Sequence, residues 1–231
     1  MNASPLFDEY AERYSAEVER AIGFAGQEHA YYVQAKVDAL LAIARRRLED
    51  LATAHVLDVG CGTGEAHAAL LPHVGTLEGV DVSAASLEIA ERRAPGVRYQ
   101  HYGGETLPFP NDSLDLVFAS CVLHHVEPAA RQAFVDEMSR VTRPGGLVAL
   151  AEHNPVNPLT RLVVARCAFD EGVVLVRRRA AKGYLRRAGA EPTDGPYILF
   201  FPWTTRVTRR IEQVLAPLPL GAQYVVAGRV A

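Results

Sequence analysis

The sequence has few of the residues that hold small secreted or zinc-dependent proteins together. Three cysteines occur among its 231 residues, and they lie far apart, at Cys61, Cys121 and Cys167. This set is too small and too scattered for a disulfide framework or for a zinc site built on cysteines. We therefore expect no bound metal, and a location in a reducing compartment, the cytoplasm.

Long apolar runs and an excess of basic side chains are also missing. No apolar stretch approaches the roughly 20 residues that a membrane-spanning helix needs, and no charged-then-apolar leader begins the chain. The formal net charge of −3 gives no electrostatic reason to expect a nucleic-acid partner. Neither a membrane nor a nucleic acid is expected as a partner, and the sequence does not indicate an oligomeric state.

The most informative stretch that is present runs over residues 55–64 and reads HVLDVGCGTG. Its apolar residues suit a strand that is buried on both faces of a parallel sheet. The glycines that follow, Gly60, Gly62 and Gly64, allow a sharp turn close to a ligand because they lack a Cβ. A helix is predicted over residues 65–71. Together these elements predict a nucleotide-type binding corner at the carboxyl end of a strand.

The spacing of the glycines argues against a dinucleotide. The dinucleotide fingerprint is Gly-x-Gly-x-x-Gly, whereas here the third glycine comes one residue early and Glu65 occupies the sixth position. Asp58 stands just before the turn, where its carboxylate would repel a pyrophosphate but attract an ammonium group or a hydroxyl. A generic α/β turn and an NAD-dependent oxidoreductase remain the alternatives at this point.

A second acidic residue follows a second apolar strand, predicted over residues 76–82. Asp81 lies near the end of this strand, roughly 20 residues after the glycines, where a carboxylate accepts hydrogen bonds from the two hydroxyls of a ribose. The alternative is that Asp81 caps the helix that begins near Ala84, a position that Ser83 fills equally well.

Two later motifs complete the pattern. Residues 107–118 read LPFPNDSLDLVF, a loop that enters a buried fourth strand, and residues 143–146, RPGG, join a helix to the apolar strand 147–151. With the glycine turn and Asp81, these motifs resemble class I S-adenosylmethionine-dependent methyltransferases over residues 55 to 152. The closest general resemblance is to the ubiquinone/menaquinone-biosynthesis-like group of small-molecule enzymes.

The resemblance implies an α/β fold. A Rossmann-like seven-stranded sheet in the order 3-2-1-4-5-7-6, with strand 7 antiparallel, would be flanked by helices. Residues 1–52 are expected to form an N-terminal helical lid. Residues 53–231 are expected to form the methyltransferase core domain, with an irregular, substrate-covering insertion at about 154–180.

Three elements are expected after the insertion. A helix is predicted over residues 180–188, and Gly189 suits its end. Residues 198–203 and 223–230 are predicted to be the last two strands, which the resemblance places as an antiparallel pair at the end of the sheet.

The cofactor implied by the resemblance is S-adenosylmethionine, with S-adenosylhomocysteine as product. Its binding residues are expected to be Asp58, Gly60, Cys61, Gly62, Gly64, Asp81, Val82, Gly103, Gly104, Glu105, Ser120, Cys121 and, from the lid, Tyr14. Members of this subtype usually carry an Asp, four residues before Leu-Pro-Phe, that binds the adenine amino group. Gly103 stands there in this chain, so backbone groups or Glu105 are the candidates for adenine recognition.

Acceptor chemistry is expected at the ends of strands four and five. His153 follows strand five, and an imidazole with a pKa of about 6.5 serves as a general base near neutral pH. His124 and His125, a pair usual in this subtype, are further candidates for accepting a proton. The alternative for all three is structural: hydrogen bonds that hold their loops.

The expected function is methyl transfer to a small-molecule acceptor, in bacterial secondary or specialised metabolism. A long lid and an insertion would enclose a small acceptor rather than a polymer, and Tyr14 or Tyr31 would contact the sulfonium unless these aromatics only pack the helices. The alternative function is a protein of this fold that binds the cofactor without methylating, such as a cyclase or a partner protein. The sequence does not identify the acceptor.

Overall fold

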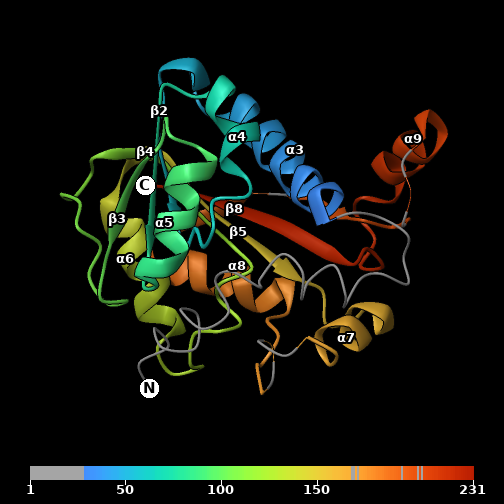
Figure 1. Ribbon diagram of the computed structural model, residues 1–231. Coiled ribbons are helices and arrows are strands. Elements are labelled where there is room, and N and C mark those ends of the chain that lie inside the picture. Colours follow the sequence, from blue (N-terminus) through green and yellow to red (C-terminus); the bar gives the residue numbers. More distant parts are fainter. Residues whose placement is uncertain (1–28, 168–169, 171, 194, 202, 204) are drawn as a thin grey trace.

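One mixed β-sheet organises the protein in the computed structural model, which describes residues 29–231 apart from 168–169, 171, 194, 202 and 204 (Figure 1). The strand order is β3-β2-β1-β4-β5-β8-β6, and a short strand, β7, also pairs with β8. The strands are β1 (His55–Val59), β2 (Thr76–Asp81), β3 (Arg98–His101), β4 (Leu114–Ser120), β5 (Thr142–His153), β6 (Ala190–Thr193), β7 (Tyr197–Ile198) and β8 (Gln223–Val230).

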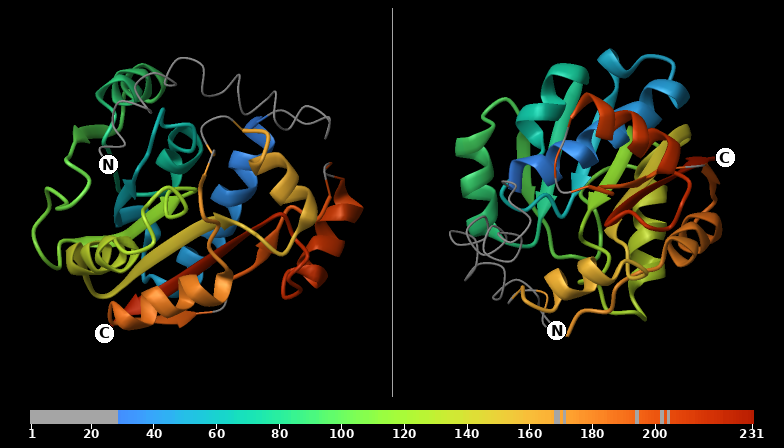
Figure 2. Two further views of the ribbon diagram at one scale, coloured as in Figure 1. Left: turned by 90° about the horizontal axis from the view of Figure 1, so that it is seen from below. Right: turned by 90° about the vertical axis from the view of Figure 1, so that its right-hand side faces the viewer.

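Helices cover both faces of this sheet. In chain order they are α3 (His29–Arg47), α4 (His67–Leu70), α5 (Ala84–Arg93), α6 (Arg131–Val141), α7 (Pro158–Val164), α8 (Arg178–Arg187) and α9 (Arg206–Leu215), with short 3₁₀ turns at Leu51–Thr53 and Leu71–His73. Helix α3 lies on one side of the sheet, and α6 and α8 lie on the other (Figure 1 and Figure 2). No described helix is long and apolar enough to cross a bilayer.

Alternate residues of the strands pack into two separate apolar layers, one on each face of the sheet. In β1, Val56 belongs to the layer that contains the buried residues of α3, and Leu57 belongs to the layer that contains Val135 and Met138 of α6. Both β1 residues are fully buried. A strand covered on both faces has no polar side, and this explains the continuous apolar run in its sequence.

The predicted sheet order is confirmed, with β8 as the antiparallel strand beside β5. The strand predicted over residues 198–203 is found only in part, as β7, which ends at Ile198 and pairs antiparallel with β8. The edge strand of the sheet is instead β6, which begins at Ala190, directly after the left-handed Gly189 (φ 78°) that follows α8. Pro192 lies within β6, which an edge strand tolerates because one of its sides makes no ladder hydrogen bonds.

Several predicted boundaries also change. The insertion expected to be irregular contains α7, which begins at Pro158. Asn157 caps this helix, because its side chain accepts a hydrogen bond from the Thr160 amide. Residues 143–146 are a bulge within β5, where the register with β4 shifts, rather than a separate turn. The helix predicted over residues 65–71 is shortened to α4. Helix α9 was not predicted.

The described part of the predicted lid is helical. Helix α3 spans most of residues 29–51, as the apolar spacing predicted. Tyr14 and the remainder of residues 1–28 lie outside the described residues, so the lid and the domain boundary at residue 52 stay predictions.

Candidate active site

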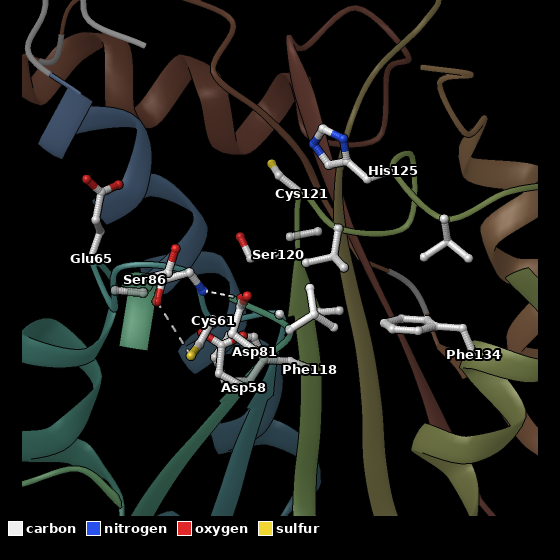
Figure 3. A pocket seen from close by; sticks show the side chains of 18 of the residues that line it. Asp58, Cys61, Glu65, Asp81, Ser86, Phe118, Ser120, Cys121, His125 and Phe134 are labelled. Carbon is white, nitrogen blue, oxygen red and sulfur yellow. Dashed lines mark hydrogen bonds between the residues drawn. The ribbon is translucent and has the colours of Figure 1, made fainter. Parts of the chain in front are cut away.

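A cavity of about 1000 Å³ lies at the carboxyl ends of the parallel strands. Asp58 and Asp81 lie toward one end of it, and Cys121 and His125 lie toward the other (Figure 3). The cavity is lined by most of the residues predicted to bind the cofactor: Asp58, Gly60, Cys61, Gly62, Asp81, Val82, Gly103, Gly104, Glu105, Ser120 and Cys121. Gly64 is not among the lining residues.

The three glycines of the turn all have positive φ but differ in what surrounds them. A Cβ on Gly60 would lie 2.7 Å from the Val122 side chain, and one on Gly64 would lie 2.9 Å from the Tyr99 hydroxyl. A Cβ on Gly62 would meet no atom within 4 Å. Gly60 and Gly64 are therefore required by packing, whereas Gly62 faces the open space in which a ligand fits.

Asp81 is fixed at the end of β2 by two backbone amides. Its Oδ2 accepts a hydrogen bond from the Gly62 amide at 2.7 Å, and its Oδ1 accepts one from the Ser83 amide at 2.9 Å. Ser83 itself caps α5 through the Ser86 amide. Burial raises the pKa of the Asp81 carboxyl, although the two amides act in the opposite sense. Each oxygen keeps acceptor capacity for a ligand hydroxyl.

Asp58 has one satisfied and one unsatisfied oxygen. Its Oδ2 lies 3.1 Å from Nε2 of His67, whose Nδ1 lies 2.8 Å from the Tyr99 hydroxyl. Its Oδ1 is buried and has no hydrogen-bond partner among the described residues. A buried acceptor left unpaired costs roughly 1–3 kcal/mol, so this oxygen suits a donor supplied by a ligand. His67 and Tyr99 carry no motif and were missed from the sequence.

The opposite end of the cavity contains a cysteine in an unusual setting. Cys121 has a φ of 59°, and its Sγ lies 3.5 Å from Nζ of Lys36 and 3.9 Å from Nε2 of Gln223. Burial alone would raise the pKa of Cys121, but the Lys36 ammonium and a hydrogen bond with His153 lower it to about 6. These neighbours favour the thiolate form of Cys121.

At the other end of the cavity, the pKa of Cys61 is shifted in the opposite direction from that of Cys121. Burial and the nearby carboxylates of Asp58 and Asp81 raise the pKa of its thiol. Cys61 therefore stays protonated at neutral pH, as suits a small residue packed in a turn.

The three predicted catalytic histidines lie in different positions. His125 lines the cavity, whereas His124 and His153 do not. His153 interacts with Cys121, which lines the cavity. Nδ1 of His153 lies 3.3 Å from Nε2 of Gln223. His124 is buried, with Nδ1 2.6 Å from Oε2 of Glu152.

Electrostatics separates the two adjacent histidines. Burial opposes the charged form of His124, but the carboxylates of Glu152 and Asp170 outweigh it and raise the pKa of His124 to about 10. Burial and the positive charge of His124 lower the pKa of His125 to about 4. Each ring nitrogen of His124 thus lies beside a carboxylate, Nδ1 beside Glu152 and Nε2 beside Asp170.

Comparison with known proteins supports one family. The family described as "Methyltransferase domain" matches residues 56–146. An uncharacterized methyltransferase of Synechocystis (sll0829) is 38% identical over 114 residues, covering 48% of this chain and 54% of the relative. A demethylmenaquinone methyltransferase of Clavibacter sepedonicus is 35% identical over 130 residues, covering 54% and 52%. The chain thus spans about half the length of these relatives.

A solved structure shares the fold over nearly the whole chain. A SAM-dependent methyltransferase of Thermotoga maritima has a TM-score of 0.70 and 18% identity, covering 97% of this chain and 98% of that one. At this identity the likeness concerns the fold.

Proposed function

Because this chain belongs to the class I S-adenosylmethionine-dependent methyltransferases, we propose that it transfers a methyl group to a small molecule held in the cavity. The main support for the proposal is that the glycine turn, Asp81 and the loop after β4 all line the same cavity. The Clavibacter relative, named for a menaquinone precursor, supports a small acceptor in bacterial metabolism, and specialised metabolism is part of the proposal.

The residues present fit the cofactor. Asp81 would hold the ribose hydroxyls, the Oδ1 of Asp58 would accept a hydrogen bond from a ligand donor, and the surface at Gly103, Gly104 and Glu105 would contact adenine. A Cβ on Gly103 would meet no atom within 4 Å, so space is open where the family usually has Asp. When bound, S-adenosylmethionine supplies a methyl group activated by a positively charged sulfur.

The cavity is large enough to hold an acceptor beside the cofactor, since pockets for one drug-sized ligand measure roughly 300–1000 Å³. Helix α3 contributes Val33, Lys36 and Val37 to its lining. We assign to α3 the role of the described part of the lid, which would exclude water from the acceptor.

Removal of the acceptor proton is assigned to the end of the cavity at Cys121. His153 lies beside the Cys121 sulfur, and Nε2 of Gln223 lies 3.3 Å from Nδ1 of His153. The acceptor proton passes to the sulfur of Cys121, which lines the cavity, and from the resulting thiol to an unprotonated ring nitrogen of His153, so that the sulfur is restored. His125 is a weaker base because its pKa is lowered to about 4.

Replacement of Asp81 by Asn tests the ribose site. Asp81→Asn is expected to weaken binding of S-adenosylhomocysteine by about 1–3 kcal/mol, or roughly 5- to 150-fold, because one charged acceptor is lost. Calorimetric titration measures the change. Asp136→Asn, on the exposed face of α6, is the matched control and should bind as the unaltered protein does. Equal affinity in both variants would mean that the ribose does not bind at Asp81.

Activity is tested by release of S-adenosylhomocysteine from S-adenosylmethionine in the presence of hydroxylated quinones and other small phenols or enols. Acceptor-dependent release is the expected result. Tight binding of the cofactor with no release from any acceptor would favour the non-methylating alternative.

A further inference from the structure

Two histidines and one aspartate meet beside the cavity, and of the three His125 is the one that lines it. Nε2 of His124 lies 3.5 Å, and Nε2 of His125 lies 3.3 Å, from the same Oδ1 atom of Asp170. The three ligand atoms all lie within 4.8 Å of one another. Around a tetrahedral zinc ion with bonds of about 2.0–2.1 Å, ligand atoms stand roughly 3.3 Å apart. Both nitrogen–oxygen separations therefore match those of two ligands on one ion.

Asp170 gives a second, independent indication of a ligand. Its side chain is 5% exposed, and its Oδ1 makes no hydrogen bond with any residue in the described part of the chain. A buried carboxylate oxygen between two imidazoles needs a cation beside it, and either a metal ion or a protonated His124 meets that need.

The surroundings of His124 are those of a metal-binding histidine. Its Nδ1 lies 2.6 Å from Oε2 of Glu152, and Oε1 of Glu152 accepts a hydrogen bond from the Leu123 amide at 2.7 Å. A fixed carboxylate on Nδ1 orients the ring and leaves Nε2 available for a metal ion. The sheet itself holds this carboxylate in place, since Glu152 belongs to β5.

We propose that His124, His125 and Asp170 bind a divalent transition-metal ion, zinc by ligand type, with one coordination position open toward the cavity. Three protein ligands and an open fourth position are typical of catalytic zinc sites. His125 lines the cavity, so the open position faces the space assigned to the acceptor.

The use of such an ion follows if the proposed function holds. A metal ion bound to a phenol or enol oxygen of the acceptor favours the deprotonated form, and so assists methyl transfer to that oxygen or to the adjacent carbon. The preferred acceptors would then carry an acidic hydroxyl beside a carbonyl, which binds a metal ion through two oxygens. Metal binding itself is measured without cofactor or acceptor, so its test does not depend on the proposed methyl transfer.

The rival explanation needs no metal. A protonated His124 between the carboxylates of Glu152 and Asp170 would hold the cluster together by charge alone. The two explanations differ in whether the purified protein takes up an ion at this place.

The experiment titrates chelator-treated protein with Zn²⁺ by calorimetry and with Co²⁺ by visible absorption, which reports the ligands around cobalt. One equivalent is expected to bind. Asp170→Asn and His125→Gln should each weaken binding by more than about 100-fold, since even loss of an outer hydrogen-bonding partner costs 10- to 100-fold. His73→Gln, on an exposed residue outside the cavity, is the matched control and should bind one equivalent unchanged.

Two results would overturn the proposal. If the unaltered protein binds neither ion at micromolar concentrations, the cluster is held by a protonated His124. If Asp170→Asn and His125→Gln bind as tightly as His73→Gln, the ion lies elsewhere. Circular dichroism of each variant shows whether it has folded, and titration with S-adenosylhomocysteine in the presence of chelator tests the proposed function separately.

Discussion

Gly62→Asp is expected to weaken binding of S-adenosylhomocysteine by more than about 100-fold, or about 2.7 kcal/mol, without unfolding the protein. Gly62 has a φ of 53°, and Asp tolerates this left-handed conformation better than most residues. A Cβ there meets no atom within 4 Å, so the new side chain enters the cavity rather than the core. Its carboxylate would also stand beside that of Asp81, which accepts the Gly62 amide.

Calorimetry measures the loss, and thermal unfolding checks the fold. Gly189→Asp is a close control, because Gly189 also has a positive φ, 78°, and open space at its Cβ position, but does not line the cavity. Any cost of placing Asp in the left-handed region should therefore appear in both variants, and loss of binding only in Gly62→Asp. Full affinity in Gly62→Asp would place the cofactor away from this turn.

His153→Gln is expected to lower turnover by about 10²- to 10⁴-fold, the usual contribution of a general base. Glutamine retains a neutral polar side chain near Gln223 but does not accept a proton as imidazole does. Affinity for S-adenosylhomocysteine should stay within about twofold, because His153 does not line the cavity. Turnover is measured by release of S-adenosylhomocysteine with a saturating acceptor.

His73→Gln gives the matched control, since it makes the same change at an exposed histidine. If His153→Gln is as active as this control, His153 is not the base, and Cys121→Ser becomes the decisive variant. Loss of cofactor affinity in His153→Gln would instead indicate a role in shaping the loop after β5.

Local patterns explain what the sequence predicted well. The run Val56-Leu57 faces two apolar layers, so burial on both sides could be inferred from composition alone. Asp81 could be placed because the end of a strand and the glycine turn converge at one sheet edge, and both its oxygens now bind backbone amides there. The motif did not reveal that Gly64 serves packing against Tyr99 rather than ligand access.

The remainder of the site depends on contacts between distant segments. Lys36 comes from α3 and Gln223 from β8, and both meet Cys121 only after the chain has folded. Asp170 lies in the segment after α7 and approaches His124 and His125 without any motif of its own. The edge strand was misplaced because the apolar run that begins at Ile198 looked more strand-like than the short segment that contains Pro192.

Titration of the unaltered protein with S-adenosylhomocysteine, and in parallel with NADH, tests most directly whether this cavity takes a nucleoside without phosphate. One equivalent of S-adenosylhomocysteine should bind, and NADH should neither bind nor compete. Tight binding of NADH, or no binding of S-adenosylhomocysteine, would contradict the account.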